Sequence, residues 1–165
     1  MPLHASAVGS PIGSLDITYD SRWLMAYAAG VPDERPELYD TDAGVIVHPL
    51  FPVAPEWALI ISQQAEGTGL TSDEARRGIH IGHDLLIERP LAAGEQVHLS
   101  AQIVGVGRLR AGATQHTLFT AVDDAGAVVW RTLFTNLYLA VELVGDPVDP
   151  AVGWPKLPTA PAAGS

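Results

Sequence analysis

Cysteine is absent from the 165 residues, which excludes a disulfide framework, a cysteine nucleophile and a thiolate metal site. Basic residues are scarce, since nine Lys and Arg stand against 19 Asp and Glu for a formal charge of -10. A charge of this sign repels nucleic acid and anionic membrane surfaces. No apolar run approaches the roughly 20 residues that span a bilayer, and the start MPLHASAVGSPIGS lacks the basic and apolar regions of a signal peptide. We therefore expect a cytoplasmic protein that binds neither nucleic acid nor membrane.

The length and composition are those of one globular domain, with 47% apolar and 17% charged residues. We expect an N-terminal extension over residues 1–14, a single domain over 15–143, and a flexible proline-rich tail over 144–165. The arginines at 76, 77, 89, 108 and 110 have two interpretations. They are either solvated surface residues or a local basic spot that could hold a phosphorylated cofactor against the negative overall charge.

Two helices are predicted in the first half of the chain. Asp20 is a good N-cap for the first helix, which ends at Gly30 and is followed by a long acidic loop. The run HPLFPVAPEW, residues 48–57, carries a proline at every third position, so it should stay extended until Pro55 opens a second helix over 55–65. This second helix is apolar around most of its circumference, which indicates that other structure encloses it.

From Gly78 onward the hydrophobic period changes to two, which is typical of strands. Strands are predicted over residues 79–88, 96–104, 113–122 and 128–140, after a short one at 45–47, with a turn over 105–112. Four consecutive strands with tight turns predict an antiparallel meander. The fold class is therefore α+β, with the sheet curled around a central hydrophobic helix as in the hot-dog fold. A cystatin-like helix on an open sheet is the competing arrangement.

Four segments carry a resemblance to a known family. They are SRWLMAYAAGV, VIVHPLFPVAPEW, RRGIHIGHDLLIERPLAAGEQVHLSAQIVGVG and DDAGAVVWRTLFTNLYL. In this order and spacing they resemble the N-terminal half of MaoC-like dehydratases, the R-specific enoyl-CoA hydratase group. The resemblance implies a hot-dog fold and reversible addition of water across the 2,3 double bond of an acyl thioester. It implies no separate cofactor, because coenzyme A or acyl carrier protein is part of the substrate.

The chain departs from this family at two catalytic elements. Active copies carry a motif like G-D-x-N-P-aliphatic-H, and Asp33 and Pro36 align with its Asp and Pro, but Arg35 replaces Asn and Leu38 replaces His. Active copies also have a glycine after the histidine at the entry to the central helix, whose N–H helps to hold the thioester oxygen. Here Pro49 stands in that place and has no N–H. Both losses indicate a non-catalytic copy whose partner hot dog performs the chemistry.

The candidate site residues fall into three groups. Asp33, His48 and His83 are the candidate catalytic residues, and no metal is expected, because His80 and His83 lie three apart on a predicted strand and so should point to opposite faces. The candidate substrate contacts are apolar side chains that could equally serve as core: Leu50, Phe51, Val53, Trp57 and Ile61. Glu56 lies in the first turn of the second helix, where it is either a thioesterase base or a carboxylate that stabilises the helix dipole.

Three functions remain open at this point. The leading hypothesis is a hot-dog subunit of an acyl-thioester hydratase or dehydratase that shapes the acyl pocket while a partner supplies the catalytic Asp and His. The second is a self-sufficient homodimeric acyl-CoA thioesterase that uses Glu56, and the third is a non-catalytic acyl-CoA-binding protein. A homodimer or heterodimer with another hot-dog subunit is expected in each case, because a second copy normally covers the sheet edge of this fold.

Overall fold

The computed structural model describes residues 2–63, 69–150 and 153. Its helical elements are the short 3-10 helices η1 (Ala5–Ala7) and η2 (Pro36–Leu38) together with α1 (Ser21–Gly30), α2 (Val53–Gln63) and α3 (Ser72–Ala75). Its strands are β1 (Leu3–His4), β2 (Pro11–Thr18), β3 (Gly78–Ile87), β4 (Gln96–Leu109), β5 (Gly112–Asp123), β6 (Val128–Leu139) and β7 (Leu143–Val144).

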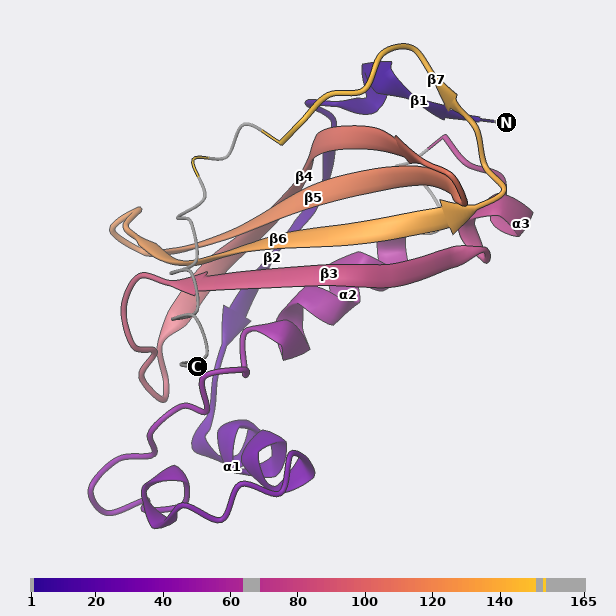
Figure 1. Cartoon of the computed structure of the whole chain (residues 1–165). Helices are drawn as coiled ribbons and strands as arrows, with labels where there is room; N and C mark the ends of the chain where they lie inside the picture. Colours follow the sequence, from indigo (N-terminus) through magenta and orange to yellow (C-terminus); the bar gives the residue numbers. More distant parts are fainter. Residues whose placement is uncertain (1, 64–68, 151–152, 154–165) are drawn as a thin grey trace, which may run out of the picture.

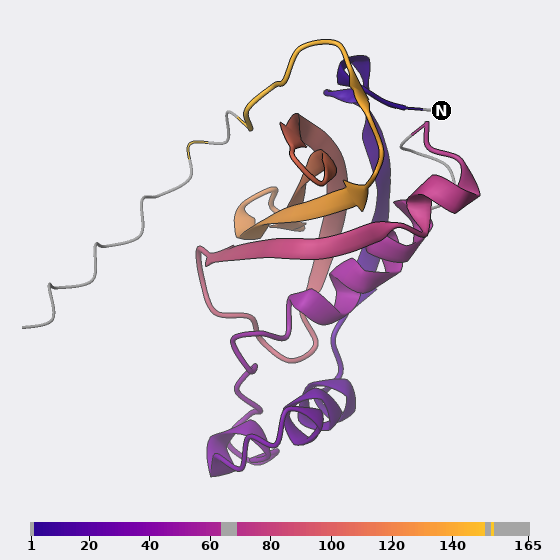
Figure 2. The ribbon, with the colours of Figure 1, turned by 45° about the vertical axis from the view of Figure 1, so that its right-hand side comes forward.

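Five strands form one antiparallel sheet in the order β2-β4-β5-β6-β3, which curves around α2 (Figures 1 and 2). This arrangement confirms the predicted α+β class and the hot-dog fold. The predicted meander is wrong at one point, because β3 does not pair with β4 but crosses to the other edge and pairs with β6. Period-two patterning identifies a strand without identifying its neighbour, so the sequence pattern could not show this crossover.

Residues 11–14 of the expected N-terminal extension are part of β2 and so belong to the five-stranded sheet, whereas residues 3–4 form a separate two-stranded sheet. β2 begins at Pro11 and pairs with β4, while β1 pairs in parallel with β7 near the end of the described chain. At the other end, Val148 exchanges backbone hydrogen bonds with Val106, so the first residues of the expected tail lie against β4. The remainder of that tail, residues 151–152 and 154–165, lies outside the described residues.

Local capping and turn chemistry set the ends of two elements. Asp20 Oδ1 accepts a hydrogen bond from the Trp23 backbone N–H at 2.7 Å, which confirms the predicted N-cap of α1. The turn expected over 105–112 is much shorter, because β4 continues to Leu109 and only two residues separate it from Gly112. A Cβ on Gly112 would lie 2.0 Å from the Tyr138 carbonyl oxygen, so this position accepts only glycine. The expected strand at 45–47 is reduced to one bridge between Ile46 and Ala92.

Helix α2 is enclosed on one side only. Its inner side chains, Glu56, Leu59 and Ile60, are buried against the sheet. On the outer side Trp57 and Ile61 are 51% and 56% exposed, so the described part of this chain leaves that face of the helix uncovered. An apolar circumference predicts that a helix is enclosed, but it does not show whether the same chain or another one covers each side.

Strand β3 contains a bulge that changes the direction of its histidines. The pairing with β6 runs from His80 opposite Asn136 to His83 opposite Phe134, with the register shift between His80 and Gly82. Because Asn136 and Phe134 are two residues apart, the histidines opposite them share one face of the sheet. The rings of His80 and His83 are 5.5 Å apart, so the predicted opposite orientation is wrong.

Candidate functional site

Asp33 and His48 lie together in the loops that flank α2 and α1. The His48 Nε2 and Asp33 Oδ2 atoms are 3.3 Å apart. Asp33 is also held by Arg35, whose Nη2 donates to the same oxygen at 2.6 Å and whose Nε lies 3.0 Å from both carboxylate oxygens. The hydrogen bonds from Arg35 lower the pKa of Asp33. Two predicted catalytic residues are therefore brought together, with the carboxylate held ionised and fixed.

The two nitrogens of His48 have different surroundings. The Leu50 backbone N–H donates to Nδ1 at 3.1 Å, so Nδ1 is an acceptor. Nε2 lies 3.3 Å from Asp33 Oδ2, which is an ion-pair distance without hydrogen-bond alignment. Because Nδ1 is occupied by its own loop and Nε2 lies beside a carboxylate, the geometry of His48 fits a brace for the entry to α2.

An apolar cavity of about 350 Å³ opens beside this brace. Its wall on one side is the segment around His48 and Pro49, and its other wall is the connection that follows β3. The apolar and proline side chains that line it are Ile46, Val47, Pro49, Pro52, Ile87, Pro90 and Leu91. Cavities of this size and character hold small ligands or a short acyl chain.

The five predicted acyl contacts lie elsewhere. Phe51 is fully buried, and its ring makes edge-on contacts with Tyr19, Trp23 and Tyr27, so it is a core residue. Leu50, Trp57 and Ile61 are more than half exposed, and Val53 is half-buried. None of the five lines the apolar cavity as the described residues define it. Sequence reasoning missed Ile87 and Leu91, which reach this cavity only because the chain after β3 folds back over the loop at His48.

Glu56 forms a second carboxylate–histidine pair inside the fold. The carboxylate is completely buried, and its Oε1 accepts hydrogen bonds from Trp130 Nε1 at 2.8 Å and from Thr132 Oγ1 at 2.6 Å. Its Oε2 lies 3.2 Å from His83 Nε2. This last contact has the distance of an ion pair but not the alignment of a hydrogen bond. Among the described residues, neither Glu56 Oε2 nor His83 Nε2 has a hydrogen-bond partner.

The His83 ring is presented at the seam between α2 and β3. Its side chain is 14% exposed, and its ring packs edge-on against the ring of Phe134. The Phe134 ring also stacks on the ring of His80, with the centroids 4.6 Å apart. No described residue forms a hydrogen bond with His83 Nδ1. A histidine with one nitrogen beside a buried carboxylate and the other nitrogen unused has the arrangement of a general base.

Sequence reasoning placed Glu56 and His83 among the candidates without connecting them. The residues that complete the pair, Trp130 and Thr132, are two positions apart on β6 and so share its inner face. Their spacing is visible in the sequence, but the register that sets them opposite Glu56 is not.

No group of three or more His, Asp or Glu side chains that could hold a metal ion occurs in the described ranges. None of the helices described is long and apolar enough to cross a membrane.

No family model and no curated protein matches the sequence, but solved structures match its fold. The 3R-hydroxyacyl-ACP dehydratase complex HadBC of Mycobacterium tuberculosis matches with a TM-score of 0.60 and 14% identity over 74% of this chain and 90% of that chain. The (R)-hydratase of A. caviae involved in PHA biosynthesis matches with a TM-score of 0.56 and 18% identity, over 79% of this chain and 95% of that chain.

A third match is longer than this protein. The MaoC-like dehydratase of Phytophthora capsici has a TM-score of 0.67 and 19% identity, and the alignment covers 92% of this chain but only 51% of that chain. Two short proteins and half of a long one thus share the curved sheet and central helix described above. The chain has the hot-dog fold of the MaoC-like dehydratases and R-hydratases.

Proposed function

We propose that this protein is a hot-dog subunit of an acyl-thioester hydratase or dehydratase, and that it shapes the acyl pocket while a partner hot dog supplies the catalytic Asp and His. The reaction is the reversible addition of water to a 2-enoyl group carried by coenzyme A or acyl carrier protein. The observation that carries the proposal is His48: it is part of the wall of an apolar cavity, yet its Nδ1 already accepts a hydrogen bond from Leu50 N–H and its Nε2 lies 3.3 Å from the Asp33 carboxylate.

Two further features support a non-catalytic role for this part of the chain. Leu38, which aligns with the catalytic histidine of the resembling motif, is 1% exposed and packs in the interior. Pro49 lines the cavity at the point where an active copy would offer a backbone N–H to the thioester oxygen. This part of the chain thus keeps an apolar wall but has neither a histidine at position 38 nor a backbone N–H at position 49.

The outer faces of α2 and β3 support a partner subunit. Trp57, Ile61, Ile79 and Ile81 are between 44% and 56% exposed, and β3 is an edge strand whose free side faces no described strand. Exposed apolar side chains beside an open sheet edge favour association. The HadBC complex is a neighbour by fold, and the Phytophthora dehydratase has twice the aligned length, so a second hot dog beside the first is consistent with both.

Hydration assays test the proposal. The purified chain alone should not hydrate crotonyl-CoA, whereas a complex with a hot-dog partner that carries an intact G-D-x-N-P-x-H motif should do so. Ordinary enzymatic turnover by this chain alone would contradict the proposal.

In the complex, Ile46→Trp should raise KM for long acyl chains more than for short ones, because Ile46 is an exposed residue in the cavity wall. Val144→Trp, on an exposed residue of β7 that does not line this cavity, is the matched control.

A thioesterase is the second candidate, and the pair of Glu56 and His83 favours it. Here His83 would take a proton from water, the resulting hydroxide would attack the thioester carbonyl, and Glu56 would stabilise the imidazolium until the departing thiolate takes the proton. This function predicts thiol release from acyl-CoA by the chain alone, lost in His83→Asn and in Glu56→Ala. His98→Asn is a suitable control, because His98 is half-exposed and pairs with Asp16 on the opposite edge of the sheet. Binding of acyl-CoA without hydration or thiol release, in either preparation, would instead indicate a binding protein.

A further inference from the structure

The bulge in β3 brings two histidines together on the face of the sheet that packs against α2. The rings of His80 and His83 have centres 5.5 Å apart and planes inclined at 68°. Opposite directions of these side chains were the reason for which the sequence excluded a shared metal ion, and the register shift removes that reason. Both rings also contact Phe134, His80 by stacking and His83 edge-on, so one phenyl ring orients the two imidazoles.

Each of these histidines has an oxygen acceptor beside its Nε2 atom. His80 Nε2 lies 3.0 Å from the Gly82 carbonyl oxygen. Because a carbonyl oxygen only accepts, the proton of the neutral His80 ring lies on Nε2 and the lone pair on Nδ1. His83 Nε2 lies 3.2 Å from Oε2 of the buried Glu56 carboxylate. Metal-ligating histidines usually have this arrangement, in which a carboxylate or a backbone carbonyl beside one ring nitrogen orients the other nitrogen toward the metal.

The Nδ1 atoms of the two rings remain for a ligand. No described residue forms a hydrogen bond with either atom, and the His80 side chain is exposed while that of His83 is 14% exposed. A zinc–nitrogen bond is about 2.0–2.1 Å long, so two imidazoles that share one tetrahedral ion have ring centres roughly 5 Å apart. The observed separation of 5.5 Å is close to that value. The spacing of the rings therefore fits one ion between them.

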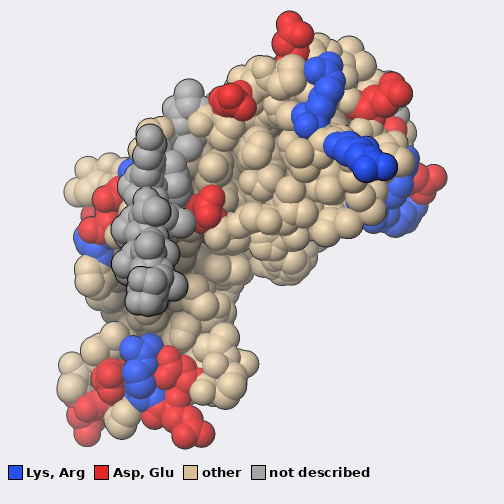
Figure 3. Space-filling view, viewed as in Figure 1, with Lys and Arg blue, Asp and Glu red and all other residues tan. Residues whose placement is uncertain are grey.

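The surroundings of the histidine pair favour a metal that prefers nitrogen ligands. Figure 3 shows charged side chains mainly at the two ends of the molecule, with an uncharged surface between them over the middle of β3 and α2. Asp84 follows His83 directly, but neighbours on a strand point to opposite faces. Imidazole suits zinc, copper and nickel, whereas magnesium and calcium prefer carboxylate and carbonyl oxygens. The described residues offer no set of three ligands, so water would fill the other positions around the ion.

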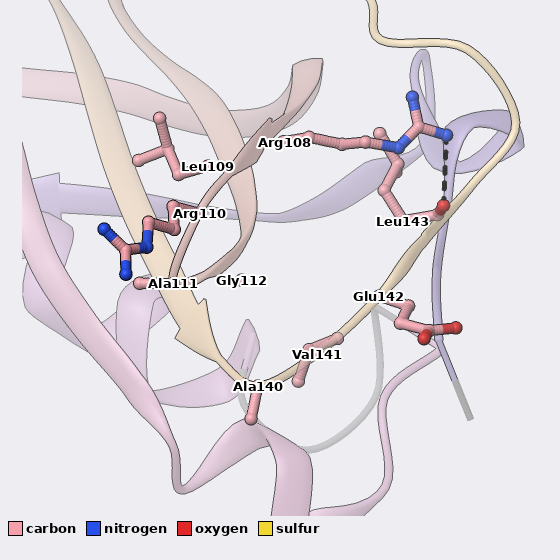
Figure 4. Close-up of a pocket in the computed structure, with 9 residues that line it drawn as sticks. All are labelled: Arg108, Leu109, Arg110, Ala111, Gly112, Ala140, Val141, Glu142 and Leu143. Carbon is pink, nitrogen blue, oxygen red and sulfur yellow. Dashed lines mark hydrogen bonds between the residues drawn. The ribbon is translucent and has the colours of Figure 1, made fainter.

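The cavity at the other end of the sheet has no such convergence of groups. It measures about 490 Å³ and lies between the turn after β4 and the segment from Ala140 to Leu143 (Figure 4). Its two arginines, Arg108 and Arg110, extend to opposite sides (Figure 4). Arg108 also donates to the carbonyl oxygens of Leu143 and Gly145. Two basic groups that diverge do not form one site, whereas the two histidines share a face and a packing partner.

We propose that His80 and His83 bind one divalent ion of the late first-row transition metals, such as Zn²⁺ or Cu²⁺, through their Nδ1 atoms. Glu56 is a positioning residue in this site, because it lies beside His83 Nε2 and has no contact with the ion. Neither histidine lines the apolar cavity beside His48. The proposal therefore goes beyond the acyl pocket, and it stands or falls independently of any hydration activity.

Calorimetric titration of the untagged full chain with Zn²⁺ tests the site. One ion per chain should bind saturably, and an excess of Mg²⁺ should not displace it. Loss of a group that orients a metal ligand typically costs about 10–100-fold in affinity, so Glu56→Gln should weaken binding by about tenfold and His80→Asn by at least as much. His98→Asn is the matched control, because His98 also pairs with a carboxylate, that of Asp16, but its own contacts include no second histidine. This variant should leave the affinity unchanged.

A second measurement counts the ligands directly. The electron paramagnetic resonance spectrum of the Cu²⁺-loaded chain should show coupling to two ring nitrogens, and that of His80→Asn coupling to one. Because the His80 side chain is exposed, this variant should fold normally, and thermal unfolding checks this. Three results would overturn the proposal: no saturable binding of Zn²⁺, an equal loss of affinity in His80→Asn and His98→Asn, or coupling to fewer than two ring nitrogens in the wild type.

Discussion

Replacement of Glu56 by alanine tests how the interior of this hot dog is organised around a buried carboxylate. Trp130 and Thr132 are both 0% exposed, and both donate to the same oxygen of Glu56. In Glu56→Ala these donors would have no partner and no access to water. An orphaned buried donor costs about 1–3 kcal/mol, so the two together should lower the free energy of unfolding by about 2–6 kcal/mol.

Urea unfolding followed by tryptophan fluorescence and by circular dichroism measures this loss. Glu56→Gln keeps a side-chain oxygen as acceptor, so it should lose clearly less than Glu56→Ala. Asp124→Ala removes an exposed carboxylate in the turn between β5 and β6 and should change the stability by less than about 0.5 kcal/mol. In the double variant Glu56→Ala/Thr132→Val the orphaned hydroxyl is gone, so part of the loss should be recovered.

A loss of less than about 1 kcal/mol in Glu56→Ala, the lower bound for one orphaned donor, would contradict this prediction. An equal loss of stability in Glu56→Ala and Glu56→Gln would contradict it too. Either result would mean that Trp130 and Thr132 find other acceptors, and that the carboxylate is held in the interior for a reason other than these two hydrogen bonds.

Four further predictions follow from single contacts. Arg89 lowers the pKa of Glu95 below its usual 4.5 and the pKa of Asp123 below its usual 3.8. The stabilisation from these two carboxylates is therefore present above those pH values and is lost as the pH falls through their folded-state pKa. Arg89→Gln should flatten the acid limb of a stability–pH curve. Burial lowers the pKa of His116 below 6.5, so the unfolded chain takes up the proton first as the pH falls, and stability should decline below about 6.5 in the wild type but not in His116→Asn. Gly112→Ala should destabilise by about 3 kcal/mol or more in urea titrations, since its Cβ would meet the Tyr138 carbonyl oxygen. Asp20→Ala should cost about 1 kcal/mol, measured in the same way, because it removes the cap from Trp23 N–H.

The elements that the sequence predicted best are those whose signals are local. The N-cap at Asp20 and the four strands from β3 to β6 depend on neighbouring residues, and the structure confirms them, although β4 continues five residues past its predicted end. β2 was missed although Ile12 to Ile17 alternates weakly, because Gly13 and Ser14 interrupt its apolar pattern. The pairing of β3 with β6 was missed because it depends on the path of the chain and not on the strand's own residues.

The candidate site shows the same limit. Residue chemistry and the family resemblance selected Asp33, His48, Glu56 and His83, and the structure joins them as two pairs. The sequence could not show which carboxylate meets which histidine, since the partners come from different loops, a helix and a strand. The predicted orientation of His83 relative to His80 was wrong because one extra residue in β3 shifts the register, and the sequence signals that bulge only by the isolated Gly82.

The two pairs differ in what each leaves available for chemistry. His48 Nδ1 accepts a hydrogen bond from Leu50 N–H and its Nε2 lies 3.3 Å from Asp33, so the entry to α2 and the loop that resembles the catalytic motif brace each other beside an apolar cavity. His83 has its Nε2 on Glu56, and no described residue bonds to its Nδ1. Its ring lies at the seam of α2 and β3, where the exposed Trp57 and the free strand edge would meet a second hot dog. Any chemistry that this chain contributes itself should therefore depend on His83 rather than on His48, and comparison of His83→Asn with His48→Asn in the assembled complex separates the two.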